Sequence, residues 1–232
     1  MQRITTVGFD ADDTLWHNES IFRLTQDRFR ALMAEHAAPE ALDARLAEVE
    51  RRNLALYGYG VKGFTLSMIE TAMELTGDRA PGRLVAELLA AGREMLSHPV
   101  ETLPGAAEAF AALAGDYRLV LITKGDLLHQ EQKLAASGLG EHFAAVEIVS
   151  EKNASTYERV FARYGTGAAQ AAMVGNSLRS DVIPALEAGC YAAHVPYELT
   201  WAHELAEPPR GHPRFAELAS LADLPAWLRA LS

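Results

Sequence analysis

The chain contains five short apolar segments with the length and composition of buried β-strands. Each is brief and rich in β-branched residues, and polar or glycine-containing turns follow it. Amphipathic stretches with helical periodicity separate the last four segments, and each of the three stretches ends at a glycine. Strands that alternate with helices indicate a parallel sheet covered on both faces. The predicted strands are residues 4–9, 117–123, 144–150, 171–176 and 192–196, and the helices between the last four are residues 129–138, 156–165 and 180–189.

The interval between the first and second strands is much longer than one crossover helix requires. Hydrophobic residues recur in it with helical spacing, which predicts several helices rather than a loop. We therefore expect a helical domain inserted after the first strand of an α/β core. The expected helices are residues 19–36, 40–57, 64–76, 82–97 and, back in the core, 104–115. The expected division is 17–99 for the inserted domain and 1–16 with 100–232 for the core.

Composition and charge narrow the class of protein. Of the 232 residues 49% are apolar, which is enough for a buried core, and the net charge of −10 argues against a nucleic-acid-binding surface. Cys190 is the one cysteine, so no intrachain disulfide forms and a reducing compartment fits. The chain has no apolar run long enough to cross a membrane and no signal-peptide pattern before the first strand. We expect a cytoplasmic protein without nucleic-acid or membrane partners; its oligomeric state is not specified by these patterns.

Polar side chains of chemical interest follow the predicted strands at the point where each strand ends. The carboxyl ends of parallel strands share one edge of the sheet, so these side chains should converge on one crevice. Carboxylates as close in sequence as Asp10, Asp12 and Asp13 repel one another unless a cation compensates. Carboxylate and amide oxygens suit Mg²⁺, so we predict a magnesium site that also contains a nucleophile. The side chains are Asp10 and Asp12, Thr123, Lys152, and Asn176 with Asp181.

Four motifs in this order resemble those of the haloacid dehalogenase superfamily, and in particular its phosphohydrolases. DADDT (10–14) matches the family's D-x-D-x-T signature, LITKG supplies the hydroxyl of Thr123, and Lys152 matches the third motif. The fourth motif usually reads GDxxxxD and here reads GNSLRSD (175–181), with Asn176 in place of the more usual Asp. The resemblance implies a Rossmann-like core, with a parallel sheet between two layers of helices, and a helical cap made by the insertion.

The resemblance also implies a role for each residue. Asp10 would be the nucleophile that forms an aspartyl-phosphate, and Asp12 the general acid and base. Thr123, Lys124 and Lys152 would bind the phosphoryl group. The metal ligands would be Asp10, the backbone carbonyl of Asp12, Asn176 and Asp181. The expected substrate is a small phosphorylated metabolite.

Two other functions remain open from the sequence. A 2-haloacid dehalogenase of the same superfamily is opposed by Asp12, because a halide leaving group needs neither a proton nor a metal. A phospho-accepting receiver domain of signalling proteins also places Asp, Thr and Lys at strand ends around Mg²⁺. The long insertion opposes that function, because a receiver is one compact domain.

Overall fold

The computed structural model describes residues 3–231, and the chain divides into two compact units. The first unit comprises residues up to Glu19, Val100–Lys124 and the chain from Gln130 on. The second comprises Ser20–Pro99 together with Gly125–His129. Within the described residues no helix is both long and apolar enough to cross a membrane.

A six-stranded parallel sheet forms the centre of the first unit, which confirms the predicted α/β class. The strand order is β3-β2-β1-β4-β5-β6, so β1 lies in the middle between β2 and β4. The five predicted strands are all present, and β6 was not predicted because it has three residues and lies beyond a proline-rich stretch. The strands are β1 (Thr6–Phe9), β2 (Arg118–Lys124), β3 (Ala145–Val149), β4 (Ala171–Gly175), β5 (Tyr191–His194) and β6 (Phe215–Glu217).

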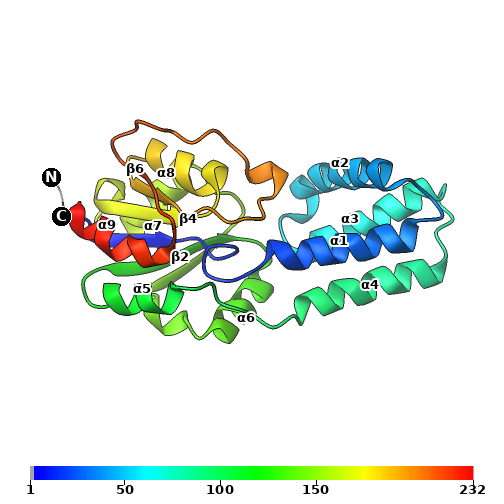
Figure 1. Ribbon diagram of the computed structural model, residues 1–232, viewed down its shortest axis with the longest axis horizontal. Coiled ribbons are helices and arrows are strands. Elements are labelled where there is room, and N and C mark those ends of the chain that lie inside the picture. Colours follow the sequence, from blue (N-terminus) through cyan, green and yellow to red (C-terminus); the bar gives the residue numbers. More distant parts are fainter. Residues whose placement is uncertain (1–2, 232) are drawn as a thin grey trace. The chain divides into compact units, whose positions relative to one another are not determined.

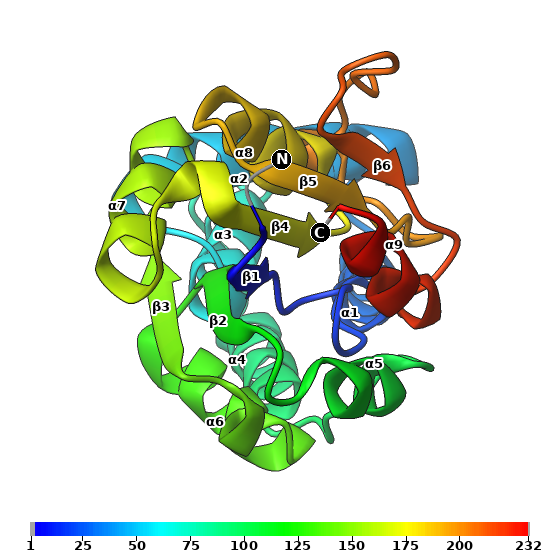
Figure 2. The same cartoon turned by 90° about the vertical axis from the view of Figure 1, so that its left-hand side faces the viewer.

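Helices cover both faces of this sheet (Figure 2). One face packs on α5 (Ala106–Leu113), α6 (Leu127–Ser137) and α9 (Leu224–Ala230), and the other packs on α7 (Ala154–Tyr164) and α8 (Ile183–Glu187). Alternate residues of β2, β4 and β5 contribute to the two layers, as expected for strands buried on both sides.

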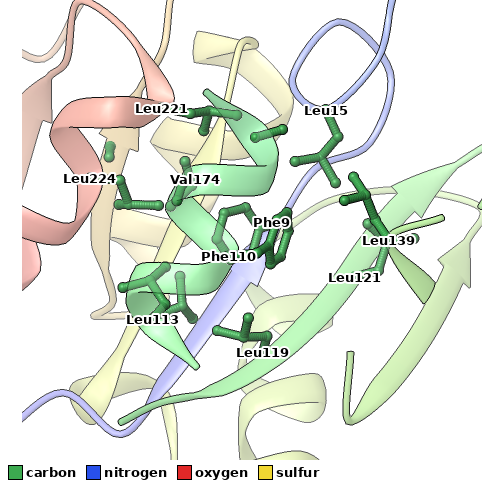
Figure 3. Close-up of a cluster of buried hydrophobic side chains, with 14 of the residues drawn as sticks. Phe9, Leu15, Phe110, Leu113, Leu119, Leu121, Leu139, Val174, Leu221 and Leu224 are labelled. Atoms are coloured by element: carbon green, nitrogen blue, oxygen red, sulfur yellow. The ribbon is translucent and has the colours of Figure 1, made fainter. Parts of the chain in front are cut away.

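The first layer is built around aromatic and leucine side chains (Figure 3). The rings of Phe9 and Phe110 lie 4.9 Å apart between their centroids. On the opposite face of β1, Gly8 lets the ring of Phe161 approach, because a Cβ there would lie closer than 3.0 Å to that ring. Strand β1 is therefore packed closely on both faces, and this packing fixes the position of the backbone from which the acidic residues follow.

The second unit consists mainly of four helices around its own apolar core (Figure 1). They are α1 (Glu19–Met33), α2 (Pro39–Tyr57), α3 (Val61–Leu75) and α4 (Gly82–Leu96), each within a few residues of the helix that periodicity predicts. Buried side chains such as Phe29, Leu46, Met68 and Leu88 form that core.

The predicted helix at 180–189 has a different form from that expected. It begins as a π-helical turn, η3 (Leu178–Val182), and continues as the short helix α8. Pro184 lies in the first turn of α8, where a missing N–H costs little. The wide turn brings Asp181 back toward Ser177, whose backbone N–H donates to Asp181 Oδ2 at 3.0 Å. Such π-turns occur frequently at functional sites.

Candidate active site

Asp10 begins the acidic stretch directly after β1. Its backbone N–H donates to the carbonyl of Val174 on β4 at 2.9 Å, so the parallel pairing extends one residue beyond the strand. Its side chain is buried. A buried carboxylate requires a cation or several hydrogen-bond donors, because burying an unpaired charge is costly.

Lys152 supplies that cation and joins Asp10 to Asp181. Its ammonium group donates to Asp10 Oδ1 and, at 2.7 Å, to Asp181 Oδ1. All three side chains are buried. They follow β1, β3 and β4, so the predicted convergence of these strand ends holds for this group.

One ammonium group cannot neutralise two buried carboxylates. Burial and the neighbouring Asp181 raise the pKa of Asp10 to about 7, despite the opposing effect of Lys152. Burial likewise raises the pKa of Asp181. Burial works against the ammonium form of Lys152, but Asp10 and Asp181 outweigh it and raise the pKa of Lys152. The group therefore carries one uncompensated negative charge when both acids are ionised.

A glycine makes room for Asp181 beside β4. A Cβ on Gly175 would lie closer than 3.0 Å to the carboxylate and the Cβ of Asp181. The side chain of Asp181 therefore packs directly against the backbone at the end of the strand. Any larger residue at position 175 would displace it.

The carboxamide of Asn176 lies where three oxygen atoms converge. One of its two terminal atoms is 3.2 Å from Asp10 Oδ2, from the Asp12 carbonyl oxygen and from Thr14 Oγ1, which suits the amide nitrogen, whose two N–H groups face these three acceptors. Thr14 Oγ1 in turn donates to Asp10 Oδ2 at 3.0 Å. Asp10 Oδ2 and the Asp12 carbonyl thus face one point, where an electropositive group is already accommodated.

The donor set at this point fits Mg²⁺, which takes hard oxygen ligands and retains several waters. Asp10, the Asp12 carbonyl and, with its amide oxygen turned inward, Asn176 could hold the ion, with Asp181 nearby on η3. Across residues 3–231 no three His, Cys, Asp or Glu side chains are grouped as metal ligands, so such a site would depend on amide, backbone and water oxygens. A divalent cation would also offset the uncompensated charge of Asp10 and Asp181.

Asp12 is held by donors on both of its oxygens. Trp16 Nε1 donates to Oδ1 at 2.7 Å, and Lys133 Nζ donates to the same oxygen at 2.5 Å. Gln130 Nε2 lies 3.1 Å from Oδ2. The same Gln130 nitrogen donates to Thr123 Oγ1 at 2.8 Å, so this side chain connects two of the predicted site residues.

Lys124 belongs to a neighbouring polar cluster. Its ammonium group donates to Ser180 Oγ at 2.9 Å and pairs with Glu204 at 2.8 Å. Ser177 and Ser180 also donate to the Glu204 carboxylate. Burial opposes the ionised form of Glu204, but Lys124 and these hydroxyls outweigh it and lower the pKa of Glu204.

Sequence reasoning did not identify Gln130, Lys133 or Glu204 as part of this region. Gln130 and Lys133 lie on α6, three positions apart, and Glu204 lies in a short 3₁₀ turn between β5 and β6. None of them directly follows a strand, so the expectation that functional residues lie at the carboxyl ends of strands could not identify them. One available signal was the scarcity of lysine, since the chain has four lysines and seventeen arginines. Three of the four lysines form ion pairs with carboxylates of this region.

Comparison with known proteins gives one family and several related structures. The family model described as haloacid dehalogenase-like hydrolase matches residues 4–189. A haloacid dehalogenase-like family hydrolase from Xanthomonas campestris is 45% identical, with a TM-score of 0.88 over 99% of this chain and 92% of that chain. None of the curated proteins matches the chain.

Two more distant structures share the fold alone. A HAD-hydrolase from Bacillus subtilis, bound to magnesium, is 18% identical with a TM-score of 0.66, and the match covers 98% of this chain and 99% of that one. The L-2-haloacid dehalogenase from Xanthobacter autotrophicus, with chloropropionic acid covalently bound, is 19% identical with a TM-score of 0.67, covering 99% and 100%.

Proposed function

Because the chain belongs to the haloacid dehalogenase-like hydrolases, we propose that it hydrolyses small phosphate monoesters with Mg²⁺ as cofactor. The observation that carries this proposal is the pair Asp10 and Asp12. Asp10 is buried beside one lysine, and Asp12 is held two residues later by side chains other than Lys152. Two carboxylates in different environments suit two different tasks, nucleophilic attack and proton transfer.

The proposed reaction has two steps. A carboxylate oxygen of Asp10 forms a bond to phosphorus while the bond from phosphorus to the ester oxygen breaks, and Asp12 donates a proton to the departing oxygen. Water then attacks phosphorus, Asp12 takes a proton from that water, and the bond between Asp10 and phosphorus breaks to release phosphate. Asp12 thus returns to its initial protonation state.

Other residues of the chain would support both steps. Thr123 and Lys152 would bind phosphoryl oxygens, and Lys152 would keep Asp10 in place. When bound by Asp10, the Asp12 carbonyl, Asn176 and Asp181, Mg²⁺ would supply positive charge to the phosphoryl group. The helical unit would act as a cap that excludes water and selects the leaving group. The alcohol or phenol that leaves defines the substrate, and a panel of phosphorylated metabolites would identify it.

Hydrolysis of 4-nitrophenyl phosphate tests the proposal. We expect turnover that requires Mg²⁺ and stops on chelation, and we expect Asp10→Asn to lose about 10³-fold or more in kcat with an unchanged circular dichroism spectrum. Asp116→Asn is the matched control, because it makes the same change at an exposed turn of the same unit and should keep wild-type activity. Wild-type rates in Asp10→Asn would exclude Asp10 as the nucleophile.

The hydrogen bonding of Asn176 favours one alternative reaction, and the same experiment can distinguish it from phosphate-ester hydrolysis. An amide nitrogen that donates to Asp10 stabilises a carboxylate nucleophile without a metal, which suits displacement of halide from a 2-haloacid. Halide release from 2-chloropropionate without Mg²⁺, and no phosphate release, would favour that reaction. One phosphate bound per chain without turnover would instead favour a receiver-type role.

A further inference from the structure

We propose that Lys133, together with Trp16, is a positioning residue that fixes the carboxylate of Asp12 for proton transfer through its Oδ2 atom. This inference rests on the proposed phosphatase function, in which Asp12 exchanges a proton with the leaving group and with water. Neither side chain belongs to the four motifs that follow the strands. All the residues concerned lie in the first unit.

The two oxygens of Asp12 have different surroundings. Oδ1 accepts from Trp16 Nε1 at 2.7 Å and from Lys133 Nζ at 2.5 Å, so both of its lone pairs are used. Oδ2 receives one contact, from Gln130 Nε2 at 3.1 Å. That nitrogen has shorter hydrogen bonds, at 2.8 Å, to Thr123 Oγ1 and the Lys124 carbonyl. Oδ2 therefore retains the capacity to carry a proton, and Oδ1 does not.

Lys133 is itself held in place. It is buried on α6, and its ammonium group also donates to Asn18 Oδ1 at 3.1 Å. A buried lysine is costly unless it is paired, and Asp12 and Asn18 supply partners that fix its ammonium group beside Oδ1. With Trp16 on the second lone pair of Oδ1, the Asp12 side chain cannot rotate without breaking two hydrogen bonds.

Gln130 ties this arrangement to the predicted phosphate-binding residue. The same amide nitrogen lies within 3.1 Å of Asp12 Oδ2 and 2.8 Å of Thr123 Oγ1. The Oδ2 atom of Asp12 is thus set at a defined distance from the residue expected to hold the phosphoryl group. A misplacement of about 1 Å at such a position can cost about 10²-fold in rate.

Substitution of Lys133 should therefore lower the rate of hydrolysis by a factor that depends on the leaving group of the ester. Without Lys133 the proton of Asp12 would be misplaced, and esters whose leaving oxygen is strongly basic would suffer most. 4-Nitrophenolate leaves without much help from a proton, so 4-nitrophenyl phosphate would be affected little. A role for Lys133 in folding alone would lower activity toward every ester by the same factor.

The experiment compares kcat/KM for phenyl phosphate and 4-nitrophenyl phosphate, with saturating Mg²⁺, in wild type, Lys133→Met and Trp16→Phe. This constant reports the step in which the ester bond breaks. For Lys133→Met we expect a loss of about 10²-fold on phenyl phosphate and under about threefold on 4-nitrophenyl phosphate. Trp16→Phe should show the same pattern to a smaller extent, because Lys133 still holds Oδ1. Arg163→Met is the control, since it removes an exposed cation that pairs with Glu147 and should change neither constant.

The outcomes separate the two proposals. Equal losses on the two esters, or no loss, in a Lys133→Met protein with a wild-type melting temperature would overturn the positioning role and leave the phosphatase function intact. If Lys133→Met does not fold, the losses on the two esters are compared in Lys133→Gln instead. Its amide donor has a shorter reach than the lysine, and the ratio of the two losses is read in the same way. A wild-type protein that releases phosphate from neither ester would remove the phosphatase function, and the role of Lys133 with it.

Discussion

At the scale of single residues, three lysines pair with the carboxylates that gather near the end of β1. Asp10 shares Lys152 with Asp181, Asp12 is bound by Lys133, and Glu204 is bound by Lys124. Asp10 and Asp181 have one lysine between them, and burial and Asp181 raise the pKa of Asp10 to about 7. The charge of this residue therefore depends on pH in the neutral range.

This shift predicts how the stability of the metal-free protein changes with pH. In the unfolded chain Asp10 ionises near pH 4, and in the folded protein it does so near pH 7. As the pH rises from 4 to 7, the unfolded chain loses the proton first, so the free energy of unfolding should fall by up to about 1.4 kcal/mol per pH unit and level off above pH 7. Urea denaturation of wild type and Asp10→Asn at several pH values, with chelator present, measures the difference.

Asp10→Asn should not show this contribution, so the two proteins should diverge between pH 4 and 7. Burial also raises the pKa of Asp13 to about 7, but Asp13 is present in both proteins and cancels in the comparison. Asp181 shares Lys152 with Asp10, so the difference between the two proteins reports the Asp10–Asp181 pair. Curves that stay parallel over this range would show that Asp10 ionises normally in the folded protein.

The sequence identified residues that follow strands and missed those that do not. The positions of Asp10, Lys152 and Asp181 could be predicted because parallel strands end at one edge, whatever the helices between them do. Lys133 and Glu204 could not, because their proximity to Asp12 and Lys124 depends on how a helix and a loop pack over that edge. The amide orientation of Asn176 was equally out of reach, since it depends on the three acceptors around it.

At the scale of elements, periodicity located the helices well because each has one continuous apolar face. Strand β6 has three residues and no such pattern, and the turn η3 has the composition of an ordinary helix start. The hydrogen bond from Val182 N to the Ser177 carbonyl, five residues back, makes it a π-turn. The same turn places Asp181 against the backbone N–H of Ser177, a contact that sequence spacing does not reveal.

The packing of α3 on α4 gives a prediction for the helical unit. A Cβ at Gly92 on α4 would lie closer than 3.0 Å to Thr65 on α3, so Gly92→Ala should destabilise this unit by about 1–3 kcal/mol. Gly82→Ala, at the open first residue of the same helix, should be neutral or stabilising by up to about 1 kcal/mol. Urea midpoints measure both changes.

A second substitution checks that the contact with Thr65 is the cause. Combining Gly92→Ala with Thr65→Ala removes the crowding hydroxyl and methyl groups, so the double variant should recover part of the stability lost in Gly92→Ala. Strict additivity of the two single changes would contradict this account.

At the scale of the whole molecule, the two units have separate apolar cores, and the proposed metal ligands lie in the first. Mg²⁺ at about 100 times its Kd should stabilise that unit by about 2.7 kcal/mol. Hydrogen exchange should therefore slow in β1, β4 and η3, and stay unchanged in α2, α3 and α4. Asp10→Asn should show a smaller effect of Mg²⁺, and slower exchange confined to the helical unit would place the ion elsewhere.

The use of lysine in this chain also has a practical consequence. All four lysines pair with a carboxylate, but side-chain exposure is 53% for Lys62 and only 12%, 10% and 2% for Lys124, Lys133 and Lys152. Amine-reactive reagents attack the neutral, accessible form of lysine, so apart from the α-amino group they should modify Lys62 and spare the other three. A fluorophore or surface tether could thus be attached to one position of the helical unit without any engineered cysteine.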